Sequence, residues 1–454
     1  MLQLAVDRGG RVPMAIAALL VLDPRARPPA DEVRAALLRR AASVPRLGDR
    51  LVPTPPAGGR AVWLDAGSAA VAGRVDSAVV SGLAPEAGGR EDADEATDRA
   101  PGRPAVPRAL LDAAADLALT RLAPDGPLWR ARTLVAPGGG VAAVVLVAHH
   151  VLADGMGGLA VLGALADPPA GAGPGEVDPP VTGARLPEPL PAWGALVWDA
   201  WAQRLGNVRR PRGAARHLTG GLDELGLGRP RLAERCSLLG RTGDRRRLEL
   251  ATADLASVRA FAHARGATVN DAVVTAVTGA LVDLLARRGE RVDELVVSVP
   301  VSRRPQADAA ALGNVTGVVP VRVPAVPDPD RRLAALVEQQ SRVRARGRGG
   351  SAAVLTPAFR ALAAVGAFQP FVDHQRLVHT FVTNVRGPAE RLRVAGAEVT
   401  AVVPVAVNPG NVAVSFDVLS YAGTLGVTLV ADPGLVPESA WLAERVADGL
   451  TASA

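Results

Sequence analysis

The chain of 454 residues contains no lysine, a single cysteine, a single tyrosine and only 3% aromatic residues. All 51 cationic residues are therefore arginine, and 45 acidic residues leave a formal net charge of only +6. The lone Cys236 excludes an intrachain disulfide and favours a reducing compartment, so we expect a cytoplasmic protein. The arginines are scattered among acidic residues without an aromatic module beside them, so we expect no nucleic-acid partner.

Long apolar runs are also missing from the sequence. The run from Val12 to Leu22 has eleven residues, whereas a membrane-spanning helix needs about 20. We predict that this run is the first strand rather than a secretory signal, and that no segment spans a bilayer. A Gly-x-Ser-x-Gly sequence is absent too, which argues against the covalent serine nucleophile of α/β-hydrolases.

Apolar residues make up 48% of the chain, enough for sizeable cores, and the length suits two domains of about 200 residues. Strand and helix patterns alternate without regular βαβ spacing, so we expect an α+β fold with mixed sheets. Trp193, Trp198 and Trp201 are expected to clamp a linker against the domains. The expected parts are an N-terminal half (1–167), a Pro/Gly-rich linker with a crossover helix (168–244) and a C-terminal half (245–454).

The most distinctive stretch contains two adjacent histidines, His149 and His150, and follows an apolar run from Val141 to Ala148. The run predicts a buried strand, paired as a hairpin with residues 128–135, and the glycine-containing residues after it predict a turn into a helix. Side chains alternate along a strand, so one imidazole should enter a cavity while the other packs inside. A neutral imidazole suits a general base that takes a proton from a hydroxyl or amine.

Two other interpretations of the histidine pair remain open. The pair can be structural, with both rings satisfied at the end of a core strand. It can also belong to a metal site, although adjacent strand histidines are poor co-ligands and no cysteine or further histidine stands at ligand spacing. We therefore predict no metal ligands.

The full stretch, His149-His150-Val151-Leu152-Ala153-Asp154-Gly155, resembles the signature of the acyl-CoA-dependent acyltransferase superfamily of chloramphenicol acetyltransferase and peptide-synthetase condensation domains. Further blocks resemble one branch of it, the bacterial wax ester synthase/diacylglycerol acyltransferase family. They are, in order, Pro127-Leu128-Trp129, Asn270-Asp271, Val299–Arg304, Leu312-Gly313-Asn314, Thr383–Pro388 and Ser420–Leu425. The chain departs from the family at Arg386, where proline is usual, and in residues 85–106, an acidic segment typical of an insertion.

The resemblance implies two chloramphenicol-acetyltransferase-like sandwiches with mixed sheets and an active-site tunnel between them. It implies that His150 takes the proton of an acceptor hydroxyl, whose oxygen attacks the thioester of acyl-CoA without a covalent enzyme intermediate. Acyl-CoA is then a co-substrate, and no cofactor is expected. In this scheme Asp154 is a buried partner that holds the loop through an arginine, which the sequence does not identify, rather than a second base, and Gly155 permits the turn. The implied catalytic set is His149, His150, Asp154 and Gly155.

The resemblance also implies substrate-binding or tunnel residues. Asn270 and Asp271 open a long helix predicted over Thr268–Arg288, in which Thr268 and Asp271 have the spacing of a capping box. Capping leaves Asn270 unexplained, so Asn270 is a candidate polar contact in the site, as is Asn384 in a later block. Three further candidates are structural or line the tunnel: Pro127, Leu128 and Trp129.

The expected function is transfer of a fatty acyl group from acyl-CoA to diacylglycerol or a long-chain alcohol. A lipid acceptor would bring the protein into peripheral contact with a membrane or lipid droplet. Arg386 and a weak family match in the first half keep a second function open: tailoring of a natural product or complex lipid, with a carrier-protein thioester as donor. A third alternative, a non-catalytic binding protein, is disfavoured because His150, Asp154 and Gly155 are intact.

Overall fold

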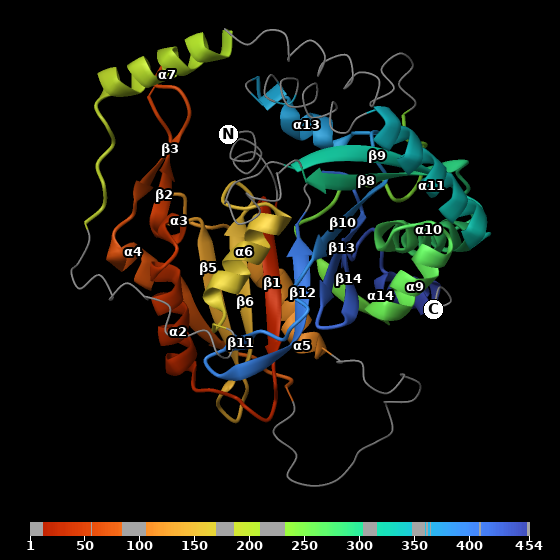
Figure 1. The fold of residues 1–454 in the computed structure, drawn as a ribbon, viewed down its shortest axis with the longest axis horizontal. Helices are drawn as coiled ribbons and strands as arrows, with labels where there is room; N and C mark the ends of the chain where they lie inside the picture. Colours follow the sequence, from red (N-terminus) through yellow and green to blue (C-terminus); the bar gives the residue numbers. More distant parts are fainter. Residues whose placement is uncertain are drawn as a thin grey trace.

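Two six-stranded sheets form the centre of the molecule and lie side by side, with helices on their outer faces (Figure 1). The computed structural model describes residues 12–55, 57–83, 106–168, 186–208, 232–302, 316–346, 359, 362–363, 365–407 and 410–451. Outside them lie residues 303–304 and Leu312-Gly313-Asn314 of the family-like blocks, and residues 85–105 of the expected insertion.

The first sheet has the strand order β11-β12-β1-β6-β5-β4. Helices α2 (Ala30–Ala42) and α6 (Gly155–Leu165) pack on one face of this sheet, and α5 (Arg108–Leu119) packs on the other. Because both faces are covered, the valine-rich β6 is apolar almost throughout instead of alternating. The strands are β1 (Ala15–Leu22), β4 (Val75–Val79), β5 (Trp129–Val135), β6 (Val141–His149), β11 (Arg393–Val394) and β12 (Ala397–Ala406).

Two sequence predictions are confirmed in this sheet. The apolar run near the N-terminus forms β1, and β5 pairs antiparallel with β6 as the predicted hairpin. Short elements flank the sheet beside α2. They are α3 (Pro45–Gly48), α4 (Ser68–Ala72) and a separate two-stranded sheet of β2 (Asp49–Val52) and β3 (Val62–Asp65).

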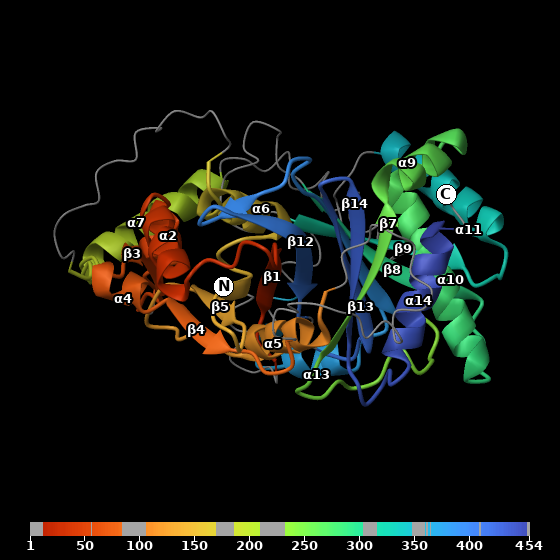
Figure 2. The same cartoon turned by 90° about the horizontal axis from the view of Figure 1, so that it is seen from below.

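The second sheet has the order β7-β14-β13-β10-β8-β9. Its outer face is covered by α9 (Leu255–Ala264), α10 (Val269–Arg287), α11 (Pro329–Arg346) and α14 (Ser439–Thr451), which Figure 2 shows as a layer to the right of the strands. A short helix, α13 (Phe368–Asp373), precedes β10. The strands are β7 (Arg247–Asp254), β8 (Glu294–Ser302), β9 (Thr316–Pro324), β10 (Thr380–Arg386), β13 (Val414–Tyr421) and β14 (Thr424–Ala431).

Each sheet contains parallel and antiparallel pairs, which confirms the predicted α+β fold with mixed sheets. In the first sheet β4 and β5 are parallel while β5 and β6 are antiparallel. In the second, β10 is parallel to β13 and to β8, while β13 and β14 are antiparallel.

Strands β11 and β12 come late in the chain but belong to the first sheet. β12 pairs antiparallel with β1, with Ala406 opposite Ile16. Figures 1 and 2 both place β12 between β1 and β13. Residues 397–406, which lie in the expected C-terminal half, therefore complete the sheet of the N-terminal half. The contribution is one-way, because all six strands of the second sheet come from residues 247–431.

The expectation that no segment has the length and composition of a membrane-spanning helix was wrong. Within the described ranges, α10 is long and apolar enough to qualify. However, 67% of its apolar stretch is buried in the protein, as in the core helix of a soluble fold. The apolar character of α10 is thus explained by its position in the core of the second half, where it packs against α14, α11 and α9.

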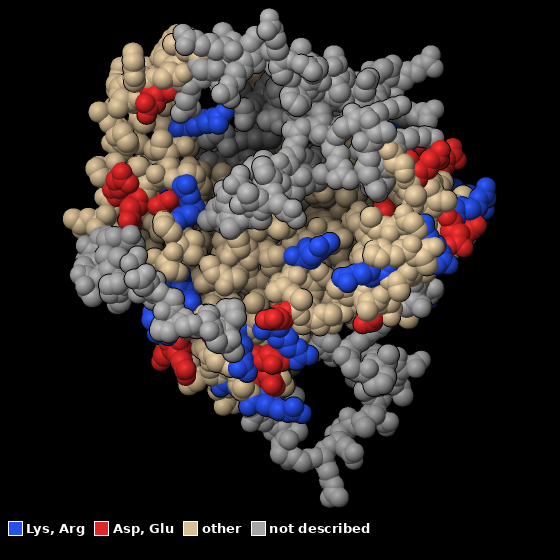
Figure 3. Space-filling model, viewed as in Figure 1, with Lys and Arg blue, Asp and Glu red and all other residues tan. Residues whose placement is uncertain are grey.

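The predicted tryptophan clamp was also wrong. The helix α7 (Trp193–Val208) projects at the edge of the molecule, at the upper left of Figure 1, and buries Leu196 and Ala200. More than half of each of its three tryptophans is exposed: Trp193 is 59%, Trp198 76% and Trp201 54% exposed. On the face in Figure 3, arginine side chains are intermixed with acidic ones, as the scattered sequence positions suggest.

Candidate functional site

The two adjacent histidines lie where β6 ends and a turn leads into α6. The backbone N–H of His150 donates to the carbonyl of Met14 at 2.9 Å. Two hydrogen bonds to His149 close the turn: Leu152 N–H donates to its carbonyl at 2.8 Å, and Val151 N–H donates to its Nδ1 at 3.0 Å. His149 is only 4% exposed. Its ring thus holds the backbone of the turn that presents His150.

His150 is half-buried beside this turn. Burial lowers the pKa of its imidazole below the ordinary value of 6.5. Hydrogen bonds to the backbone of His150 and Ala153 and the charge of Asp154 act in the opposite direction but do not cancel the effect. The neutral form, which can accept a proton, is therefore favoured near pH 7.

Asp154 is the N-cap of α6 and is 2% exposed. Its Oδ1 accepts a hydrogen bond of 2.9 Å from the N–H of Gly157. A carboxylate at this position satisfies a helix N–H and interacts favourably with the helix dipole. The structure thus gives Asp154 a role in fixing the turn, in line with its predicted structural part.

Gly155, the first residue of α6, lies against the second sheet. A Cβ built on Gly155 would be 2.8 Å from Cγ2 of Val385 in β10. Glycine is therefore needed here for close approach, and the predicted reason, conformational freedom in the turn, is not the one that the structure shows. This contact brings the start of α6 in the first half against β10 in the second.

The two predicted asparagines contact each other beside the second sheet, next in sequence to the residue that approaches Gly155. Asn384 Nδ2 in β10 donates a hydrogen bond to Asn270 Oδ1 at the start of α10, at 3.4 Å. The predicted capping box is confirmed: Thr268 Oγ1 accepts from Asp271 N–H at 3.2 Å, and Asp271 Oδ2 accepts from Thr268 N–H at 2.9 Å. Asp271 therefore caps α10, while Asn270 reaches across to β10, next to Val385.

Of Pro127, Leu128 and Trp129, Leu128 joins the start of β5 to the histidine turn. The carbonyl of Leu128 accepts the N–H of His149 at 2.9 Å. Trp129 is 2% exposed, and its indole Nε1 donates to the carbonyl of Leu47 at 2.7 Å. These contacts support the structural alternative for the three residues over the tunnel-lining one.

Asp417 is a residue that sequence reasoning missed. It lies in β13 and is 2% exposed. Its Oδ1 accepts from Thr383 Oγ1 at 2.8 Å, and its Oδ2 accepts from the N–H of Ala406 at 2.6 Å. Burial nevertheless raises its pKa to about 7. A single acidic residue within an otherwise apolar strand was the available signal, because Asp is rarely fully buried without a specific partner.

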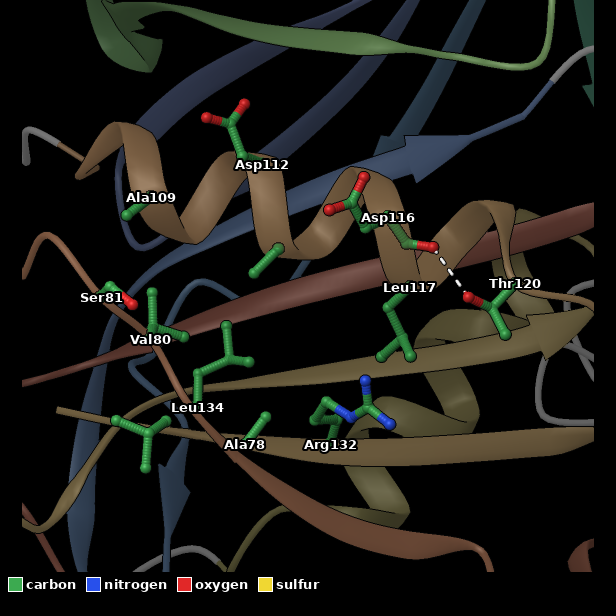
Figure 4. Close-up of a pocket in the computed structure, with 12 residues that line it drawn as sticks. Ala78, Val80, Ser81, Ala109, Asp112, Asp116, Leu117, Thr120, Arg132 and Leu134 are labelled. Atoms are coloured by element: carbon green, nitrogen blue, oxygen red, sulfur yellow. Dashed lines mark hydrogen bonds between the residues drawn. The ribbon is translucent and has the colours of Figure 1, made fainter.

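A groove away from the histidines lies between α5 and the strands β4 and β5 (Figure 4). Its volume is about 430 Å³. Arg132 in this groove pairs with Asp76 at 2.6 Å, and Thr120 Oγ1 donates to the carbonyl of Asp116 at 2.9 Å. These polar groups are engaged with each other, and the lining contains no histidine or cysteine. Across the described parts of the chain, no group of three His, Cys, Asp or Glu side chains is arranged to hold a metal ion.

Two models of one protein family match this chain, one in each half. The wax ester synthase/diacylglycerol acyltransferase catalytic domain matches residues 99–273, and the WS/DGAT C-terminal domain matches residues 312–452. A Mycobacterium tuberculosis H37Rv protein, named as a probable diacylglycerol O-acyltransferase (tgs1), is 27% identical over 475 aligned positions. The alignment covers 98% of this chain and 92% of that protein.

Solved structures show the same fold. The wax ester synthase/diacylglycerol acyltransferase from Marinobacter aquaeolei VT8 superposes with a TM-score of 0.62 at 20% identity, covering 100% of this chain and 97% of that one. The starter condensation domain of rhizomide synthetase RzmA, solved in complex with C8-CoA, superposes with a TM-score of 0.59 at 16% identity, covering 99% and 92%. The predicted chloramphenicol-acetyltransferase-like architecture is thus confirmed.

Proposed function

Because the chain belongs to the wax ester synthase/diacylglycerol acyltransferase family and is thus an acyltransferase, we propose that it transfers a fatty acyl group from acyl-CoA to a hydroxyl acceptor, diacylglycerol or a long-chain alcohol. The observation that carries this proposal is the position of His150. A neutral imidazole stands at a junction of strand and helix, close to where β10 of the other half packs on Gly155.

The proposed reaction is a direct transfer. The imidazole of His150 accepts the proton of the acceptor hydroxyl while the oxygen forms a bond to the thioester carbonyl carbon. The tetrahedral intermediate then collapses with cleavage of the C–S bond, and the departing thiolate takes the proton from the imidazolium. The products are the ester and free CoA, and His150 returns to its neutral form.

Two features support stabilisation of the charge that develops on the carbonyl oxygen. The N-terminus of α6 begins at Gly155, and helix N-termini present backbone N–H groups and a partial positive charge. On the opposite side, the amide groups of Asn270 and Asn384 form a polar contact. We propose that this pair orients the substrate, because side-chain amides can both donate and accept hydrogen bonds.

The donor and acceptor rest on separate lines of support. The rhizomide condensation domain, which shares the fold, is described with C8-CoA, and the mycobacterial relative is named for diacylglycerol. We further propose a cytoplasmic protein in peripheral contact with a membrane or lipid droplet. The exposed tryptophans of α7 support this contact, because tryptophan is favoured at membrane–water interfaces.

A second candidate function is a tailoring acyltransferase that takes its acyl group from a carrier protein. It is favoured by Arg386, which stands where the family usually has proline. Arg386 is exposed at the end of β10, two residues beyond Asn384. An exposed guanidinium suits a phosphate, and the phosphopantetheine arm carries one in CoA and in carrier proteins alike.

Release of free CoA tests the proposal. Purified protein is given palmitoyl-CoA with dioleoylglycerol, with hexadecanol or with no acceptor. We expect release that depends on an acceptor and that is lost in His150→Ala. If folded wild-type protein releases CoA with neither acceptor, the lipid acyltransferase proposal fails, and acyl-carrier-protein donors become the next substrates to test.

A further inference from the structure

The carboxyl of Asp417 connects the two sheets of the molecule. Asp417 lies in β13 of the second sheet and is almost completely buried. One carboxylate oxygen accepts the backbone N–H of Ala406 in β12, which belongs to the first sheet. The other accepts the hydroxyl of Thr383 in β10, which belongs to the second. One side chain therefore links a strand of the first sheet to a strand of the second.

The first of these hydrogen bonds leads to the histidine turn. Ala406 lies opposite Ile16 in β1, and Ile16 lies opposite Ala148 in β6, one residue before His149. Next to this row, Val407 N–H donates to the carbonyl of Ala15 at 3.1 Å. Met14, which precedes Ala15 in the chain, accepts the N–H of His150 with its carbonyl. A shift of β12 would therefore be transmitted to the turn.

The second hydrogen bond leads to the asparagine pair. Thr383 directly precedes Asn384, which contacts Asn270, and Val385 follows with its contact to Gly155. Residues 383–385 of β10 thus carry, in order, the tie to Asp417, the polar contact of the site and the packing contact with α6. A shift of β10 would change the last two together.

We propose that Asp417 is a positioning residue for acyl transfer, which holds β12 and β10 together and so sets the spacing between His150 and the Asn270–Asn384 pair. This inference rests on the proposed function, since it presupposes that the substrate is bound between these groups. Asp417 acts through Thr383 and Ala406.

The chemistry of the tie suggests a conservative variant. An ionised carboxylate accepts hydrogen bonds from both partners. An asparagine in the same place can accept the N–H of Ala406 with its oxygen and donate to Thr383 Oγ1 with its nitrogen, because a hydroxyl can also accept. Asp417→Asn should therefore preserve both hydrogen bonds, whereas Asp417→Ala removes the two of them.

Thr428 offers a matched control. It lies directly opposite Asp417 in the neighbouring strand β14 and is equally buried. Its Oγ1 has no hydrogen-bond partner among the residues that the structure describes. Thr428→Val removes a hydroxyl at the same depth and leaves the hydrogen bonds of Asp417 between the two sheets unchanged.

Steady-state kinetics of the full-length variants test the proposal, with CoA release measured on the acceptor that wild type uses. We expect Asp417→Ala to lower kcat by at least about tenfold, because displacements of about 1 Å can cost 10²-fold, with KM for acyl-CoA little changed. Asp417→Asn and Thr428→Val should stay within about threefold of wild type. Once Asp417→Ala is present, adding Asn384→Ala should cause little further loss, because both changes act on one contact.

Hydrogen exchange provides a readout that does not depend on activity. In Asp417→Ala, amide exchange should accelerate in residues 149–158 and in residues 383–386, and it should remain at wild-type rates in Thr428→Val. If wild type releases no CoA but this exchange pattern appears, the proposed function fails while the positioning role stands. The proposal is overturned if exchange at both segments is unchanged, if Asp417→Asn is as slow as Asp417→Ala, or if the Asp417 and Asn384 effects multiply.

Discussion

The two sides of the candidate site are built in different ways. On the first-sheet side, His149, His150, Asp154 and Gly155 are close in sequence, and contacts within residues 149–158 hold most of the turn. On the second-sheet side, Asn270 and Asn384 are 114 positions apart and meet only because α10 begins beside β10. The first side depends on local hydrogen bonds, whereas the second depends on the packing of a whole half.

The largest effect should come from removing the proposed base, His150, on the first-sheet side. His150→Ala should reduce the rate by about 10²–10⁴-fold, because general acid–base catalysis contributes about that much. In wild type, activity should fall only below pH 6.5, since burial lowers the pKa of His150 from that value. Rate–pH profiles and thermal melts of both proteins check this. An unfolded variant, or a rate within tenfold of wild type, would contradict the assignment.

The buried carboxyl of Asp417, which links β12 to β10, should make the free energy of unfolding depend on pH. The pKa of Asp417 is raised from 3.8 to about 7 in the folded state. Its stabilising contribution is therefore complete below pH 3.8 and lost as the pH rises through 7. The loss is on the order of 4 kcal/mol, since each pK unit corresponds to about 1.4 kcal/mol. Urea unfolding at pH 5 and pH 8 measures the part of this loss that lies between these two pH values, on the order of 3 kcal/mol.

Asp417→Asn provides the control for this prediction, because its side chain stays neutral. It should be less sensitive to pH than wild type and more stable at pH 8. The titratable side chains on strands packed against Asp417 are Arg386 in β10, Glu398 in β12 and Tyr421 in its own strand, and β14 has none. Equal pH dependence in both proteins would show that another group is responsible.

A smaller effect should come from separating the two sides at their packing contact. Gly155→Ala places a Cβ about 2.8 Å from Val385 Cγ2, and valine cannot rotate away easily because it is β-branched. We expect kcat to fall by about tenfold, as a displacement below 1 Å would cause. Adding Val385→Ala should restore most of the activity. Val385→Ala alone is the matched control, and a double variant no faster than Gly155→Ala would rule out this contact as the cause.

The smallest effect should come from removing the amide groups of Asn270 and Asn384 on the second-sheet side. Asn270→Ala and Asn384→Ala should each reduce kcat/KM by about threefold to tenfold, because one neutral hydrogen bond contributes about 0.5–1.5 kcal/mol. The double variant should lose no more than the worse single variant if the two amides act as one contact. Kinetics of the three proteins against one acyl-CoA test this. Fully multiplied losses would mean that the amides act separately.

Some of this site could be predicted because its determinants are local. The apolar run of β6, the turn and the capping residue Asp154 lie within one short segment, so their pattern already predicts the strand, the turn and the helix. The capping box at Thr268 and Asp271 is local in the same sense. Family resemblance then directed attention to Asn270 and Asn384, but neither residue's own surroundings indicated the other.

Other features could not be predicted because they depend on partners distant in the chain. The exposed position of the tryptophans in α7 depends on which face of that helix packs on the rest of the protein. The placement of β12 in the first sheet depends on competition between two sheets for the same strand. Asp417 had a visible signal, an acidic residue in an apolar strand, but its two hydrogen-bond partners come from β10 and β12.

By itself, the sequence determined the family, the mixed α+β fold and the local frame around His150, because periodicity, turn residues and caps act over a few neighbouring positions. Only the tertiary structure decided how the two sides face each other. The pairing of β12 with β1, the contact of Gly155 with Val385 and the hydrogen bonds of Asp417 each join residues from different parts of the chain. Their positions follow from close packing of the folded core, which no local pattern records.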